Sequence, residues 1–179
     1  MQLNDFHIIF SRTDSWSENG RLLKVGKVRL SIEPNPFLNA SDYLQELHLN
    51  HGEIIVSAGD VVLVALVDAN NPAVRLHVSS STPVSLNITT EIWRTKIRKL
   101  SSKEKFSAFG ICDDVYVYPD QIVTESPNVM WYHRNHLDNV WKVALEKQSL
   151  GYLQEKLQDP ITNRTFGAVI VVWKHQTQI

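Results

Sequence analysis

The sequence predicts a mainly β protein: an antiparallel β-sandwich with one or two short helices in its C-terminal third. Three patterns support this prediction. Residues 25–33 alternate apolar and polar side chains, as a half-buried strand does. Similar short segments recur between turn residues as far as Trp93, and the run Val61–Val67 is apolar on both faces, which is typical of a sandwich core. The best helix candidate by the spacing of its apolar residues lies near the end of the chain.

The predicted strands follow one another with tight turns between them. The turn residues His51-Gly52 and Gly59-Asp60 join three of these strands into a meander. In the first strand of this meander, Leu47 and Leu49 are expected to face the core. In chain order, the predicted strands cover residues 25–33, 44–50, 53–57, 61–67, 74–80, 84–93, 115–118, 129–133 and 166–173.

One helix is predicted over residues 139–148, with Asp138 as its cap and Gly151 as its end. Residues 152–157 are expected to add another turn or two. The chain has no internal repeat, low-complexity tract or linker. The simplest prediction is therefore one domain over residues 1–179.

The composition argues against two classes of partner. Among 179 residues, 18 basic side chains stand against 19 acidic ones, for a formal net charge of -1, whereas nucleic-acid affinity rests on an excess of Lys and Arg. The densest basic stretch, residues 94–105, is interpreted as a solvated strand edge and loop. No segment approaches the roughly 18 consecutive apolar residues of a membrane span, and Met1–Asp5 does not begin a signal peptide. We predict no nucleic-acid and no membrane partner.

The most polar-aromatic cluster lies at Trp131, His133, Arg134 and Asn135. Sugars are commonly bound by an aromatic face together with Arg, Asn or His hydrogen bonds to their hydroxyls. Strand alternation places Trp131, His133 and Asn135 on one face. We interpret the four residues as candidate sugar contacts. The alternative is a strand end whose Trp belongs to the core and whose polar groups cap the following helix.

The cysteine and three further tryptophans are interpreted as structural residues. Cys112 is expected to be a buried thiol, and Trp16, Trp93 and Trp141 are interpreted as core anchors. His133 and His136 have a metal-like spacing, but no further close ligand completes a site. No pair of carboxylates is singled out, and no nucleotide-binding or nucleophile-elbow motif is present. We predict no catalytic residue, no metal and no cofactor.

Several longer segments carry a resemblance to a known family. The chain resembles a bacterial N-terminal domain of unknown function, family 5703, which is similar to the N-terminal β-supersandwich of glycoside hydrolase family 95, the fucosidase-type enzymes. The resemblance covers residues 2–167. The segments that carry it are residues 13–29 (TDSWSENGRLLKVGKVR), 34–37 (PNPF), 68–72 (DANNP), 91–94 (EIWR), 131–135 (WYHRN) and 159–167 (DPITNRTFG).

The resemblance implies more than the residues alone do. It implies a supersandwich fold, and in the related hydrolases an (α/α)6 barrel with the catalytic acid and base follows this domain. It also implies a Gly-rich strand-turn ahead of the segment matching Met1–Asp5, so we expect the chain to be truncated at its start and to lack the barrel. For full-length relatives it implies a periplasmic or secreted location.

Three functions are consistent with these observations. The first is a non-catalytic accessory domain of a glycoside-hydrolase-like protein that packs against a catalytic barrel, or a partner chain, and contributes to sugar binding. The second is a free-standing carbohydrate-binding module, and the third is a structural or remnant domain without a ligand. Exposure of Trp16, Trp93 and Trp131 distinguishes them, since three buried indoles would count against the binding module.

Overall fold

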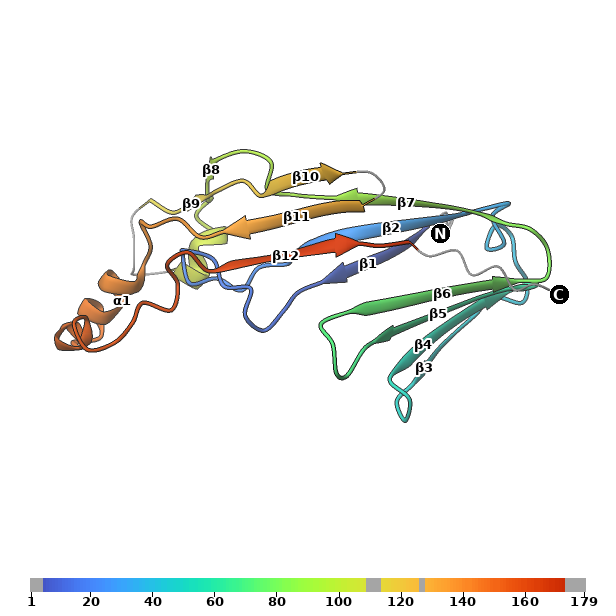
Figure 1. Cartoon of the computed structure of the whole chain (residues 1–179), viewed down its shortest axis with the longest axis horizontal. Helices are drawn as coiled ribbons and strands as arrows, with labels where there is room; N and C mark the ends of the chain where they lie inside the picture. The colour runs from blue at the N-terminus through green and yellow to red at the C-terminus, as the bar shows by residue number, and fades with distance from the viewer. Residues whose placement is uncertain (1–4, 109–113, 126–127, 173–179) are drawn as a thin grey trace. The chain divides into compact units, whose positions relative to one another are not determined.

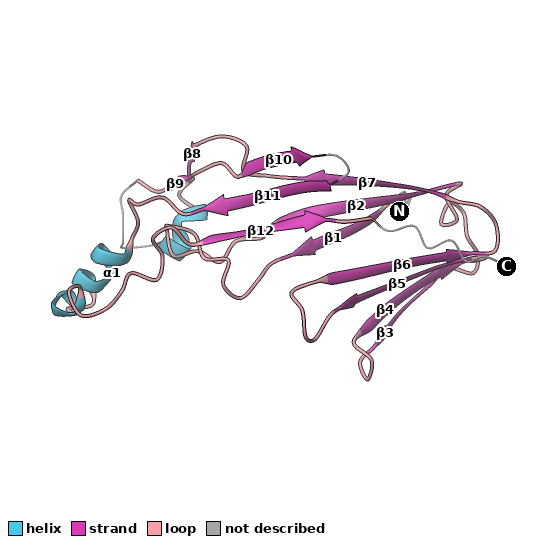
Figure 2. Ribbon diagram, in the orientation of Figure 1, coloured by secondary structure: helices cyan, strands magenta, loops and turns pink. Residues whose placement is uncertain are grey.

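The computed structural model describes residues 5–108, 114–125 and 128–172 (Figure 1). Over these residues the protein is mainly β, with antiparallel sheets and one α-helix in the C-terminal part, as the sequence predicts (Figure 2). Its elements are β1 (Phe6–Phe10), β2 (Gly26–Glu33), β3 (Leu44–His48), β4 (Glu53–Ala58), β5 (Val61–Val67), β6 (Val74–Ser80), β7 (Ser85–Glu91), β8 (Arg98–Lys99), η1 (Glu104–Ala108), β9 (Tyr116–Val117), β10 (Gln121–Glu125), β11 (Asn128–Arg134), α1 (Trp141–Lys147), η2 (Gly151–Leu153) and β12 (Thr165–Ile170).

The chain forms two compact units. The first comprises Met1–Ile8 and Val28–Thr89, and the second comprises Ile9–Lys27 and Thr90–Ile179. One domain over the whole chain stays a prediction. In the part of the chain that the structure describes, no helix is both long and apolar enough to cross a membrane.

The first unit is a two-layer sandwich. Its larger sheet is the antiparallel meander β3-β4-β5-β6, and the other layer has the strand order β1-β2-β7. Alternation fixes which side chains meet between the layers, because every second residue of a strand points to the same face. Leu30 and Ile32 of β2 therefore pack against Val56 of β4 and Leu63 of β5, all of them buried.

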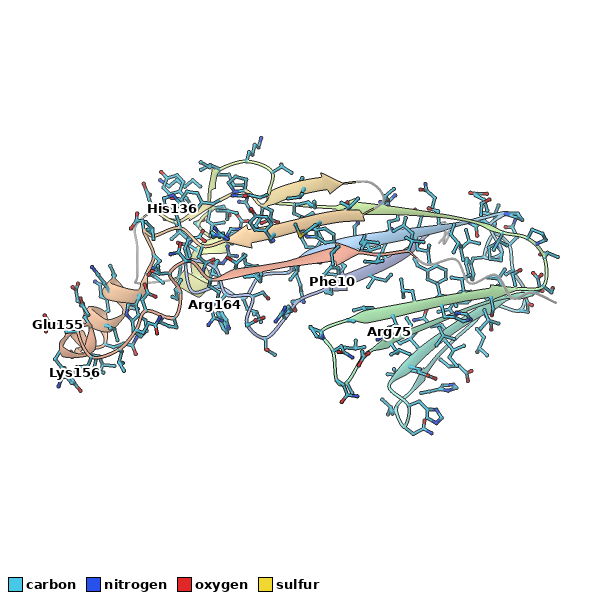
Figure 3. All side chains as sticks on the ribbon, viewed as in Figure 1. Phe10, Arg75, His136, Glu155, Lys156 and Arg164 are labelled. Atoms are coloured by element: carbon cyan, nitrogen blue, oxygen red, sulfur yellow. The ribbon has the colours of Figure 1, made fainter. Side chains whose placement is uncertain are left out.

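In this unit, the turn between β5 and β6 is stabilised by polar side chains of its own sequence. The segment that follows β5 folds around Asp68, whose carboxylate accepts hydrogen bonds from the backbone N–H groups of Asn70 (2.9 Å) and Asn71 (3.1 Å). Arg75 at the start of β6 closes the turn with its Nε (2.9 Å) and Nη2 (2.7 Å) on the same carboxylate (Figure 3). These hydrogen bonds lower the pKa of Asp68.

The prediction that Leu47 and Leu49 face the core is wrong. Their exposed fractions are 62% and 83%. Leu47 lies on the edge strand β3, opposite Ile54 of β4, beyond the rows of side chains that the two layers bury. At that end a groove of about 270 Å³, lined among others by Ile54 and Leu76, separates the layers. The alternation of apolar residues predicts which face of β3 is turned toward the other layer. It does not predict how far along β3 that layer extends.

The second unit is built on the antiparallel sheet β10-β11-β12, with β11 in the centre. Trp131 on β11 is completely buried, and its Nε1–H donates to the carbonyl oxygen of Val25 (2.9 Å). Its indole lies directly over Gly26, where a Cβ would come within 2.8 Å of the ring. Only a glycine leaves room for so close an approach of the indole to the backbone.

The helix is present, but its ends differ from those expected. Val140, not Asp138, is the N-cap residue of α1 and makes no side-chain capping bond, while the side-chain oxygen of the preceding Asn139 accepts the N–H of Trp141 at 2.8 Å. The chain leaves the helix at Ser149, whose φ is 59°, before it reaches Gly151. The extra turn expected over residues 152–157 is the short 3-10 helix η2.

The contact between Trp131 and Gly26 predicts a stability effect. Gly26→Ala should lower the free energy of unfolding by about 1–3 kcal/mol, because the added methyl forces the buried indole out of its position. Gly151→Ala is the control, since a Cβ there meets nothing closer than 3.7 Å. Urea unfolding of both variants measures the difference, and equal effects would contradict this account.

Candidate ligand-binding site

A tight turn in the second unit carries an acidic residue into the interior. The Ser17 N–H donates to the Arg21 carbonyl oxygen (2.9 Å), and the Gly20 N–H donates to the Ser17 carbonyl oxygen (2.9 Å). Gly20 has a φ of 66°, a left-handed conformation that glycine adopts without strain. This closed turn presents Glu18, which is only 1% exposed.

Glu18 meets a histidine that lies between two carboxylates. The His133 Nε2 lies 3.0 Å from Glu18 Oε2, and its Nδ1 lies 3.0 Å from Asp120 Oδ1. The three side chains are almost completely buried. Burial disfavours the charged imidazole, but the hydrogen bonds to Asp120 and Glu18 outweigh it and raise the pKa of His133 above 6.5. The imidazolium is therefore favoured at this position.

An arginine extends this arrangement toward the surface. Arg94 Nε and Nη2 donate to the two oxygens of Asp120, both at 2.7 Å, and Nη1 donates to the carbonyl oxygen of Lys24 at 2.7 Å. Glu18, His133, Asp120 and Arg94 thus form a continuous buried ionic chain. Two carboxylates and two cationic groups alternate along it, which offsets the cost of burying each charge.

This ionic chain is not arranged as a metal centre. The two carboxylates lie on opposite nitrogens of His133, so the donors face one another and do not converge on a common point. Within the described residues, no three His, Cys, Asp or Glu side chains gather in a way that could hold a metal ion. The chemistry that the arrangement supports is positional: it fixes the Arg94 side chain.

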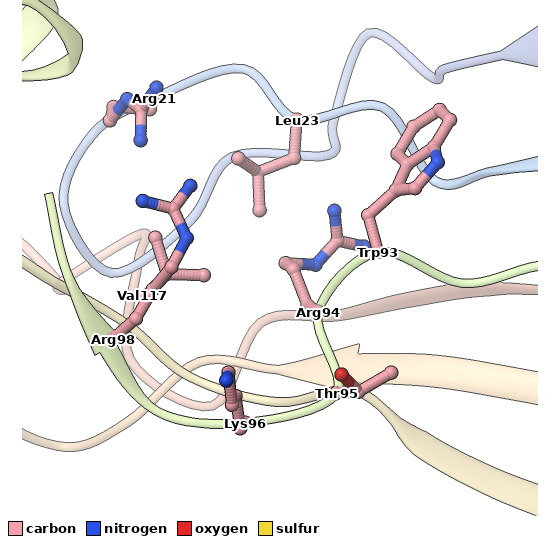
Figure 4. Close-up of a pocket in the computed structure, with 8 residues that line it drawn as sticks. All are labelled: Arg21, Leu23, Trp93, Arg94, Thr95, Lys96, Arg98 and Val117. Carbon is pink, nitrogen blue, oxygen red and sulfur yellow. The ribbon is translucent and has the colours of Figure 1, made fainter.

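Arg94 forms part of the wall of a surface pocket of about 220 Å³ (Figure 4). One side comes from the loop that contains the Glu18 turn, and the other from the segment between β7 and β8 and from Arg98 of β8, with a contribution from β9. The residues that line the pocket are Arg21, Leu23, Trp93, Arg94, Thr95, Lys96, Arg98 and Val117.

The pocket combines an exposed indole with cationic and hydroxyl groups. Trp93 is 46% exposed, and Thr95 and Lys96 are also open to solvent. Arg98 is held by an end-on pair with Glu104, through Nη2 at 2.7 Å and Nη1 at 2.9 Å. This pair lowers the pKa of Glu104 to about 2. An aromatic face beside several hydrogen-bond donors is suited to a polar ligand with an apolar side.

The predicted sugar contacts occupy a different place. Trp131 and His133 on the inner face of β11, and Asn135 directly after the strand, are buried, with exposed fractions of 0%, 1% and 2%. Arg134 points to the opposite, exposed face, where its Nε donates to Thr165 Oγ1 at 3.1 Å. The structure therefore brings three of the four together and separates the fourth. Sugar contact by these residues stays a prediction, and the buried Trp matches the alternative interpretation.

Several other interpretations need correction. Trp16 and Trp93, interpreted as core anchors, are 41% and 46% exposed. Arg94, placed in a solvated stretch, is buried because Asp120 and two backbone carbonyls surround its guanidinium. Cys112 lies outside the described residues.

The polar groups of the Trp131 cluster do not cap the helix. Asn135 instead donates to the backbone carbonyl oxygens of Trp16 and Ile161.

Sequence reasoning missed Glu18, Asp120 and Trp93 as site residues. Glu18 and Asp120 are single acidic residues in irregular segments, where no periodicity indicates whether a side chain is buried. The usable signal was local: the residues Asn19-Gly20 after Glu18 favour a tight turn there, although they do not indicate that Glu18 is buried.

Two fork-shaped Arg–Asp pairs allow a matched test of the buried ionic chain. Asp120→Asn should lower the free energy of unfolding by about 3–5 kcal/mol, because it leaves Arg94 and His133 without their shared buried carboxylate. Asp14→Asn breaks the exposed pair with Arg12, made through the same Nε and Nη2 atoms at 3.0 Å. The loss there should be about 1 kcal/mol or less. Similar losses in urea unfolding would contradict the account.

The raised pKa of His133 also predicts a pH dependence. Above pH 6.5 the unfolded chain releases the His133 proton, whereas the folded chain keeps it until the raised pKa is passed. The free energy of unfolding should therefore fall as the pH rises through this window, as measured by urea unfolding. In His133→Gln the fall should be absent. A stability that increases from pH 6.5 upward would show the opposite shift.

The comparisons with known proteins give one match. A family model described as a domain of unknown function (DUF5703) matches residues 1–178. No curated protein and no solved structure matches the chain. The match spans both compact units, the Glu18 turn and all residues of the pocket. The chain therefore belongs to the family of N-terminal domains of unknown function DUF5703.

Proposed function

We propose that this chain is a non-catalytic accessory domain of a glycoside-hydrolase-like protein, and that it contacts sugar at the pocket beside Trp93. The observation that carries the proposal is the half-exposed indole of Trp93 among the donors of Thr95 and Lys96. The C–H face of a sugar packs on an indole, while neighbouring donors bind its hydroxyls.

Arg94 contributes to this site by fixing its wall. Four of its five N–H groups are directed to Asp120 and to the carbonyl oxygens of Lys24 and Val25. With its donors engaged in this way, the Arg94 guanidinium does not reorient to bind a ligand. It holds Trp93, its neighbour in the chain, in place. The donors for sugar hydroxyls are then Thr95, Lys96 and the two other arginines of the pocket.

The distribution of carboxylates supports a non-catalytic role. Glycoside hydrolysis generally uses two carboxyl groups on either side of the scissile bond. The described residues that line the pocket include no Asp or Glu. Glu18 and Asp120, the nearby acidic side chains of the ionic chain, are buried and engaged with His133.

Two further points support packing against a catalytic barrel. The first is the resemblance to the N-terminal supersandwich of glycoside hydrolase family 95. The second is the exposed apolar surface of the first unit, where Leu47, Val67 and Val74 are 62%, 73% and 43% exposed. Apolar patches of this kind often mark interfaces. A free-standing carbohydrate-binding module remains the second candidate, because the exposure of Trp93 favours it equally.

The proposal predicts that one indole reports sugar binding. Titration with mono- and oligosaccharides, including fucose and galactose, should give a saturable change in tryptophan fluorescence that Trp93→Ala abolishes. Trp16→Ala is the matched control: Trp16 is similarly exposed at 41%, but its Nε1 donates to the Thr13 carbonyl oxygen and it does not line the pocket.

Two outcomes would contradict the proposal. A folded, monodisperse sample that responds to no sugar would favour a structural domain without a ligand. Hydrolysis of fucosides or related sugars by the purified chain would overturn the non-catalytic role.

A further inference from the structure

We infer that the pocket beside Trp93 selects sugars that carry an anionic group, a carboxylate or a sulfate ester. The inference rests on the proposed sugar-binding function and specifies its ligand class. It starts from the lining, in which four of eight residues are cationic: Arg21, Arg94, Lys96 and Arg98. Among these described lining residues there is no acidic side chain.

The neutralising partners of two of these cations lie outside the pocket. Asp120 balances Arg94 from the buried side of the wall, and Glu104 binds the end of Arg98. Lys96 has no ion-pair partner among the residues that the structure describes, and it is exposed. An isolated exposed lysine is commonly just solvated. Here it lines the same concave site as the guanidinium groups of Arg94 and Arg98, so a ligand in that site meets the lysine charge beside their hydrogen-bond donors.

The arrangement of the side chains separates an apolar side from a cationic side. In Figure 4 the guanidinium groups of Arg21 and Arg98 lie on one side of the opening, Trp93 lies on the other, and Leu23 points in between them. Arg98 uses one N–H on each terminal nitrogen for Glu104, which leaves three further donors. A sugar ring stacked on Trp93 thus directs a substituent toward the cationic side, and planar guanidinium donors match the geometry of carboxylate and sulfate oxygens.

The size of the pocket favours one sugar unit. Its volume of about 220 Å³ is below the roughly 300–1,000 Å³ of typical sites for drug-sized ligands. A single charged substituent therefore accounts for a large share of the contacts. Since the site is open to water, the attraction should depend on ionic strength.

Isothermal titration calorimetry with paired probes tests the inference. Trigalacturonic acid is compared with its methyl ester, and galactose 6-sulfate with galactose, so that each pair differs in charge but keeps the same ring. The acidic member of at least one pair should bind roughly fivefold more tightly at low salt, and added salt should reduce this preference. Which pair shows the preference distinguishes carboxylate from sulfate.

Two lysine variants connect the preference to the pocket. Lys96→Gln should weaken binding of the preferred acid roughly fivefold and leave its neutral partner unchanged. Lys156→Gln is the control, since Lys156 also lies near an aromatic ring, 5.8 Å from the centre of Tyr152, but outside the pocket. Equal binding of acidic and neutral members in both pairs would overturn this inference and leave the proposed function standing. Absence of binding by all four probes and by the neutral sugar panel would overturn both.

Discussion

The second unit depends on the ionic chain of Glu18, His133, Asp120 and Arg94. Its members come from a turn, a central strand, the residue before β10 and the segment after β7, so it joins parts of the sequence that are far apart. Each charge alone would be costly to bury, but each has an opposite neighbour within hydrogen-bond distance. The two inner members, His133 and Asp120, each have two partners, so the loss of either one leaves an end member, Glu18 or Arg94, without its buried ion-pair partner.

This constraint connects the interior to the surface. Arg94 is the last member of the ionic chain and also lines the pocket, directly after Trp93 in sequence. The Glu18 turn contributes in the same way, since it is followed by Arg21 and Leu23, which line the opposite side. The residues that hold the ionic chain together thus also bring the two sides of the pocket together. The ionic chain thus preorganises the pocket wall.

The sequence predicted the regular parts of this structure and not the site. Strands such as β5 and β6 were predicted at their observed bounds, because alternation and turn residues act locally. Burial of particular side chains depends on partners that are distant in the sequence. The same residue type therefore has opposite environments: Trp131 is enclosed over Gly26, whereas Trp93 is half exposed in an irregular segment. Neither periodicity nor composition distinguishes the two, and the polar-aromatic richness of residues 131–135 serves the interior.

The most direct test of the account is an NMR titration of the tryptophan indole N–H signals, assigned by single Trp→Phe variants. The probe is trigalacturonic acid or galactose 6-sulfate, whichever binds more tightly. The account predicts a saturable shift of the Trp93 signal. The Trp131 signal should stay in place, because its N–H is buried and bound to the carbonyl oxygen of Val25. A dominant shift at Trp131, or saturable binding that leaves Trp93 unmoved, would show that the pocket described above is not the ligand site.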